Sequence, residues 1–165
     1  MDNNEIDWLK VQNFLNELDM TPEECSTKVT QEDLNNGVRE SSGAIYSADG
    51  SRLLKGPDIL MAYAIKAGTK IIADKAFYQY SNLISITIPD SVTHIGVSAF
   101  QNCQSLEYVH LSKNLTHICE KAFYGCIFLH SIDLPQSLSQ IGESAFYGCR
   151  TLISFSLPKG ITHIK

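Results

Sequence analysis

The stretch AFYGCIFLHSIDLPQSLSQIGES, residues 122–144, decides the fold because its pattern recurs on both sides at a constant interval of 23 residues. A period of this length is typical of solenoids built from stacked units. The chain is therefore a repeat protein, and the recurring positions define its architecture far better than they define a ligand. They are the Ala-Phe pairs beginning at Ala76, Ala99, Ala122 and Ala145, and the rows Leu83, Leu106, Leu129, Leu152; Ile86, Val109, Ile132, Phe155; and Ile95, Ile118, Ile141, Ile164.

Each unit is predicted to contain a strand, a turn and a second extended piece. In the motif LxxIxL, alternate residues such as Ile86 and Ile88 should point into the core. A turn follows, at a proline in most units. The chain then continues as a short extended piece, SVTHIG or SLSQIG, in which Ile95 or its equivalent should point into the core. A helical or 3₁₀ turn carrying the Ala-Phe pair completes the unit. We expect an α/β solenoid with a stacked parallel β-sheet, short helical turns and an N-terminal helical cap.

These units resemble a known family. The segments AFQNCQSLEYVHLSKNLTHIC (99–119), AFYGCIFLHSIDLPQSLSQIG (122–142) and AFYGCRTLISFSLPKGITHIK (145–165) look like the leucine-rich repeats of the bacterial BspA type, and IYSADGSRLL (45–54) resembles the hairpin that often precedes them. The resemblance covers about residues 43–165. It implies a leucine-rich repeat solenoid that is usually exported or on the cell surface, adheres to host or matrix proteins, and has no catalytic machinery or cofactor.

Residues 1–42 are assigned to an acidic helical N-terminal segment. Apolar spacings of three and four predict an amphipathic helix from Asn4 to about Asp19, and capping patterns predict a second helix from Thr21 and a third turn from Thr30, closed by Gly37. The apolar stripe of the first helix is interpreted as a cover for the open end of the repeat stack. The alternative is that it recruits a partner.

The rest of the chain, residues 43–165, is assigned to the repeat domain. The pair Asp49-Gly50 between two strand-like runs predicts a β-hairpin, and residues 43–75 hold this hairpin and a degenerate leading repeat. The clear repeats occupy residues 76–165. Residues 39–43, between the N-terminal segment and the hairpin, are predicted to be a loop.

Composition excludes several classes of protein. Residues 1–50 hold 11 acidic and 3 basic residues, a net of −8, whereas residues 51–165 hold 7 acidic and 10 basic residues, a net of +3. Bases scattered in this way form no stripe for nucleic acid, and no apolar run is long enough to span a membrane. The start MDNNEIDW lacks the features of a signal peptide, so we expect either a cytoplasmic protein or one whose leader has been removed.

Three of the five cysteines share one repeat position: Cys103, Cys126 and Cys149. Side chains stacked on neighbouring rungs, about 4.8 Å apart, point the same way, and this suits a column of small buried thiols better than the crossed geometry of a disulfide. We predict that these three are buried and reduced. The chain has no CxxC or CxxH pair of the kind that binds zinc.

The outward positions of the strands differ between units, so a ligand would be recognised there. The predicted binding residues are Tyr108, His110, Ser131 and Asp133, flanked by Glu107 and His130. Neighbouring rungs should place His110 beside Asp133 and Glu107 beside His130. We favour solvated cross-strand contacts on a binding face. The alternative is a metal or acid-base site formed by Glu107, His110, His130 and Asp133.

Two further surfaces carry expectations. His94, His117 and His163, interrupted by Gln140, form a column on the second extended piece, and we predict that it is exposed and solvated rather than a shared metal site. The last rung, ending at Ile164, should leave an open edge. This favours a homodimer through the C-terminal edge, or a longer array.

The favoured function is therefore a non-enzymatic binding module for a protein or glycan, with cell-surface adhesion implied by the family resemblance. The first alternative is an intracellular scaffold that uses the N-terminal helix, and the second is a metal-dependent enzyme. No GxSxG, HExxH, phosphate-loop or dinucleotide motif is present in the sequence.

Overall fold

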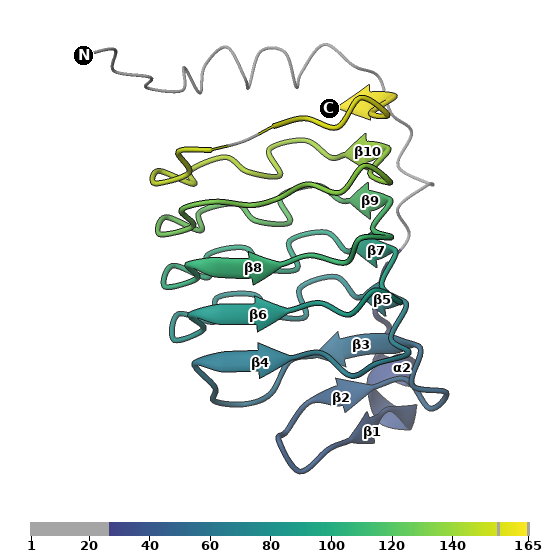
Figure 1. The fold of residues 1–165 in the computed structure, drawn as a ribbon. Coiled ribbons are helices and arrows are strands. Elements are labelled where there is room, and N and C mark those ends of the chain that lie inside the picture. The colour runs from purple at the N-terminus through teal and green to yellow at the C-terminus, as the bar shows by residue number, and fades with distance from the viewer. Residues whose placement is uncertain (1–26, 155, 165) are drawn as a thin grey trace, which may run out of the picture.

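The computed structural model describes residues 27–154 and 156–164, which coil into a parallel β-solenoid of about four turns (Figure 1). Two sheets run along the stack, where the sequence predicted one. The smaller has the order β4 (Ala62–Ala64), β6 (Ser85–Thr87), β8 (Tyr108–His110), and all its strands are parallel. Isolated bridges from Tyr108 to Ser131 and from Ser131 to Ser154 continue this ladder into the later units.

The larger sheet contains the second extended piece of each repeat. Its order is β1 (Val38–Arg39), β2 (Ile45–Tyr46), β3 (Arg52–Lys55), β5 (Ile71–Ile72), β7 (His94–Ile95), β9 (His117–Ile118), β10 (Gln140–Ile141), β11 (His163–Ile164). From β5 onward each strand pairs in parallel with the strand 23 residues further on, as in Ile95 with Ile118. The sequence repeat therefore sets the register of both sheets.

The predicted β-hairpin is confirmed by the antiparallel pairing of β2 with β3. In its turn, Asp49 Oδ1 accepts hydrogen bonds from Ser47 Oγ at 2.6 Å and from the Ser51 main-chain N–H at 3.0 Å. Arg39, which was predicted to lie in a loop, belongs instead to β1, because this strand pairs antiparallel with β2.

Helix is scarce in the described part of the chain, where α2 (Gln31–Asn36) is the only one. Thr30 caps it and forms a capping box with Asp33, and Gly37 ends it, as the sequence predicted. The helices predicted from Asn4 and from Thr21 lie outside the described residues. The helical cap is therefore not confirmed, and the described fold is a β-solenoid rather than an α/β solenoid.

The predicted helical or 3₁₀ turn around each Ala-Phe pair is not confirmed as a helix, although single hydrogen bonds of the i-to-i−3 type occur there. In the first clear unit the main-chain N–H groups of Lys75, Phe77 and Gln79 donate to carbonyls on the next rung, whereas those of Ala76 and Tyr78 donate to the residue three positions back. Three of these five N–H groups are thus used between rungs rather than within a helix. The result is a flat turn that extends the solenoid ladder.

The core is a continuous column of residues from the repeated positions. The rings of Phe77, Phe100, Phe123 and Phe146 are buried and stacked, with centroids 4.9, 5.1 and 5.4 Å apart and interplanar angles of 8°, 4° and 3°. The thiols of Cys103, Cys126 and Cys149 are free and buried, as predicted. Each donates to a phenylalanine carbonyl on the preceding rung, for example Cys126 to Phe100 at 3.1 Å. Burial raises the pKa of Cys103 and of Cys149 to about 12.

Candidate functional site

The outward face of the smaller sheet, with the loop residues that lead into it, is the candidate site that the sequence predicted. We call it the strand face and define it by Glu107, Tyr108, His110, His130, Ser131 and Asp133. The bridge between Tyr108 and Ser131 has the register expected from the repeat. All six side chains are exposed except that of Glu107, which is half-buried, and Tyr108 keeps 59% of its surface accessible.

The polar groups of the strand face are largely unused by the protein itself. Among the described residues, no hydrogen bond or ion pair joins the side chains of Glu107, Tyr108 or Asp133 to another group. His130 does not pair with Glu107, since its Nδ1 contacts the carbonyl of Phe128 and lies 3.3 Å from Thr151 Oγ1. The face therefore offers free hydrogen-bonding groups around an exposed tyrosine.

The metal-site alternative gains no support from the geometry. Within residues 27–154 and 156–164, no three His, Cys, Asp or Glu side chains lie close enough together to hold a metal ion. Glu107, His110, His130 and Asp133 are all described, so their predicted convergence does not amount to a ligand set. His110, His130 and Asp133 are also exposed to solvent, whereas such groups usually become catalytic inside a pocket that excludes water.

The histidine column is less exposed than the sequence predicted. The rings of His94 and His117 stack with centroids 4.3 Å apart and an interplanar angle of 12°, and both side chains are half-buried. Nδ1 of each ring lies 2.8 Å from the hydroxyl of the preceding threonine. Burial, together with the neighbouring His117, holds the pKa of His94 below its ordinary value. The side chain of His163 is outside the described set.

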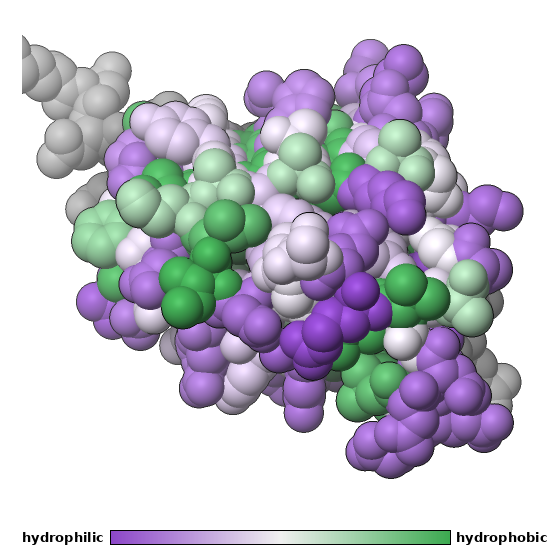
Figure 2. Space-filling model, turned by 90° about the horizontal axis from the view of Figure 1, so that it is seen from below, coloured by the Kyte–Doolittle hydropathy of each residue, from purple (hydrophilic) through white to green (hydrophobic). Residues whose placement is uncertain are grey.

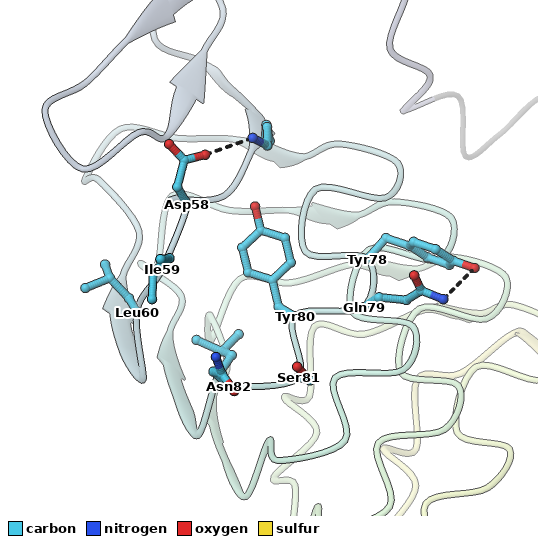
Figure 3. A pocket seen from close by; sticks show the side chains of 10 residues that line it. Asp58, Ile59, Leu60, Tyr78, Gln79, Tyr80, Ser81 and Asn82 are labelled. Atoms are coloured by element: carbon cyan, nitrogen blue, oxygen red, sulfur yellow. Dashed lines mark hydrogen bonds and ion pairs between the residues drawn. The ribbon is translucent and has the colours of Figure 1, made fainter.

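The sequence did not predict a pocket of about 430 Å³ beside the start of β4 (Figure 3). Tyr80 stands between segment 58–60 on one side and Tyr78 on the other. Its hydroxyl donates to the carbonyl of Gly56 at 3.1 Å, and burial raises its pKa. The pocket is lined by Lys55, Asp58, Ile59, Leu60, Tyr78, Gln79, Tyr80, Ser81, Asn82 and Leu83.

The pocket exists because the leading repeat departs from the pattern of the others. Leu60 is 38% exposed, although the leucines at the same position in later units, Leu83 and Leu106, are fully buried. Pro57 stands where Cys103 stands in a complete unit. The signal was therefore present in the sequence as the degeneracy of residues 43–75, but degeneracy alone does not distinguish a pocket from a filled edge.

Large apolar side chains are exposed next to this pocket. Ile59 keeps 81% and Met61 keeps 58% of its surface accessible. Figure 2 shows the end of the solenoid that carries β1, where apolar side chains gather in separate groups with hydrophilic side chains between them. An exposed apolar group rimmed by polar residues is typical of an interaction surface.

No helix described here has the length and hydrophobicity needed to cross a lipid bilayer.

Residues 69–165 match the family model described as "BspA type Leucine rich repeat region (6 copies)". A search of curated proteins finds no match to this chain.

Solved structures of bacterial repeat proteins are similar to this chain. The leucine-rich repeat protein of T. pallidum is 28% identical with a TM-score of 0.69, and the comparison covers 73% of this chain and 60% of that one. A leucine-rich cell surface protein of Faecalibacterium prausnitzii is 34% identical with a TM-score of 0.72, covering 77% and 35%. The pneumococcal vaccine antigen PcpA is 25% identical with a TM-score of 0.58, covering 67% and 32%. This chain thus matches between about a third and 60% of their lengths.

Proposed function

Since this chain belongs to the BspA-type leucine-rich repeat family, we propose that it is a non-enzymatic binding module that presents its strand face and adjoining loops to a protein or glycan. The observation that carries the proposal is the state of Tyr108, which is 59% exposed and unpaired in the middle of the smaller sheet. Tyrosine is enriched among the residues that dominate binding energy, because its ring offers apolar area and its hydroxyl a hydrogen bond.

The surroundings of Tyr108 support the same proposal. His110 and Asp133 are exposed beside it and supply a donor and an acceptor. The backbone beneath is fixed by the ladder and by the buried phenylalanine column, so little conformational entropy is lost when a ligand binds. A rigid face with free polar groups and a central aromatic residue suits recognition rather than catalysis.

We propose further that the ligand is a host or matrix component and that binding serves adhesion at the cell surface. The support is the similarity to the F. prausnitzii protein, which is described as a leucine-rich cell surface protein. The intracellular scaffold rests on residues 1–42, most of which lie outside the described range, and no specific observation favours it.

A pull-down on immobilised matrix proteins, host-cell proteins and mucin glycans tests the proposed function. The wild type is compared with the double variant Tyr108→Ala/His110→Ala, and we expect capture of a ligand by the wild type and loss of most of that capture in the variant. The matched control is Ser154→Ala/Ser156→Ala, which changes the same outward column two rungs away. Equal capture by all three proteins would rule out the strand face as the binding surface.

A further inference from the structure

Strand β4 is the terminal strand of the smaller sheet. Its order is β4-β6-β8, so β4 has a neighbour on one side only. At its other end the sheet continues through the bridges at Ser131 and Ser154. An edge strand exposes main-chain hydrogen-bonding groups that another extended chain can pair with.

The hydrogen bonds identify which groups on β4 are free. The carbonyl of Met61 accepts from Ser85 N–H at 3.1 Å, and the N–H of Ile65 donates to the Thr87 carbonyl at 3.0 Å, so alternate residues of this segment face β6. Ala62 and Ala64 must therefore direct their N–H and C=O groups away from β6. Outside the β4–β6 ladder, no main-chain hydrogen bond joins either alanine to another described residue.

Nothing in β4 itself protects this edge. Natural edge strands are commonly shielded by lysine, proline or a bulge. The sequence of β4 is Ala-Tyr-Ala, its pairing with β6 is regular, and both alanine side chains are small and exposed. An added strand would meet no charged or bulky side chain from β4.

The pocket at the start of β4 offers a second recognition element. Ile59 and Leu60 come directly before Met61 and β4, and with Tyr80 they supply an apolar wall (Figure 3). Its charged residues already neutralise each other, because Lys55 Nζ lies 2.9 Å from Asp58 Oδ1. Beside this wall, Gln79, Ser81 and Asn82 line the pocket with uncharged polar groups, so it suits an uncharged side chain rather than an ionic group.

We propose that β4 accepts an extended peptide segment of a partner protein as an additional strand, and that the pocket binds an uncharged side chain of that segment. In strand addition, main-chain hydrogen bonds supply affinity and neighbouring pockets supply specificity. A second solenoid is the poorer occupant, because the β1–β2 hairpin projects past β4 at this end of the molecule (Figure 1). The site is separate from the strand face and does not depend on the proposed function.

The test uses a displayed library of random linear peptides selected on the wild-type chain. The key variant is Ala64→Pro, which removes an N–H that faces away from β6 and so leaves the ladder intact. The control is Ala64→Ser, which keeps the N–H. We expect the enriched peptides to bind Ala64→Pro about tenfold more weakly or worse, and Ala64→Ser within about twofold of wild type. NMR should show shifts at the amides of Ala62 and Ala64.

Two further variants keep the result interpretable. If Ala64→Pro does not fold, Ile59→Ser, at an 81% exposed position, must weaken the same peptides. Tyr108→Ala/His110→Ala must leave them unaffected, which separates this site from the strand face. The proposal is overturned if no peptide is enriched, or if the enriched peptides bind Ala64→Pro and Ile59→Ser as tightly as they bind wild type. Chitotriose serves as a sugar probe of the same pocket. Binding of chitotriose in the pocket, with no peptide bound there, would also overturn the proposal.

Discussion

The backbone of the repeats is left-handed at two fixed positions. Lys75, Ser98, Lys121 and Ser144, each directly before an Ala-Phe pair, have φ between 53° and 57°. Two residues after the phenylalanine the backbone is left-handed again, at Gln79 and Asn102 in the early units and at Gly125 and Gly148 in the later ones. Side chains at such angles carry steric strain that glycine avoids.

The second residue after each phenylalanine therefore predicts whether two substitutions stabilise or destabilise the protein. Gln79 has φ of 61° and Gly148 has φ of 77° at the same place in the repeat. Replacing Gln79 with glycine should raise the free energy of unfolding by up to about 1 kcal/mol, because relief of strain outweighs the added freedom of the unfolded chain. Gly148→Gln should lower it by about the same amount. Urea unfolding of both variants measures the effect, and a stabilised Gly148→Gln would refute the explanation.

The stacked histidines predict a pH dependence. Because the pKa of His94 in the folded protein lies below the ordinary histidine value of 6.5, the unfolded state binds the proton more readily. The stability contributed by the neutral ring is therefore complete above that value and is lost as the pH falls through the folded pKa.

The variant His94→Gln separates this contribution from that of the carboxylates. Gln140 occupies the same column two rungs on, so the substitution suits the fold. Between neutral pH and about pH 5, the free energy of unfolding should fall more steeply in wild type than in His94→Gln. Identical pH profiles for the two proteins would show that the stacked pair does not control acid stability.

At the scale of the structural element, the repeat determined what could be predicted. The periodic rows gave the strands and the buried phenylalanines, since a side chain on one rung must pack on its equivalent on the next. The Ala-Phe segment was predicted to be a helical or 3₁₀ turn, but it forms no helix, because the N–H groups of Phe77 and Phe100 bond to the following rung. Those bonds arise only when units stack, so no single unit reveals them.

The phenylalanine column should carry much of the stability of the stack. Phe123 is fully buried and lies between Phe100 and Phe146. The variant Phe123→Ala should lower the free energy of unfolding by about 3 to 5 kcal/mol through lost burial and a cavity between two rungs. In the control Phe128→Ala, from the same unit but 49% exposed, the change should stay below about 1 kcal/mol. Chemical denaturation provides the measurement, and comparable losses in both variants would contradict the stacking account.

At the scale of the whole molecule, the sequence predicted the solenoid but only part of its surface. The strand face follows from the alternation of Tyr108 and His110 with the inward Val109, a pattern that residue spacing records. The pocket does not, because the opening at Leu60 depends on how the degenerate repeat meets Tyr80 in space. Likewise the burial of His94 comes from its contact with His117 on another rung. The homodimer through the C-terminal edge stays a prediction.

The most direct test of the central claim is the affinity of the captured matrix or host ligand for four proteins, measured by surface plasmon resonance. Wild type, Ala64→Pro and Ser154→Ala/Ser156→Ala should bind with Kd values within about twofold of one another, while Tyr108→Ala/His110→Ala should bind at least about tenfold more weakly, as expected when an exposed aromatic anchor and its polar neighbour are removed. An unchanged Kd for Tyr108→Ala/His110→Ala would contradict the assignment of binding to the strand face.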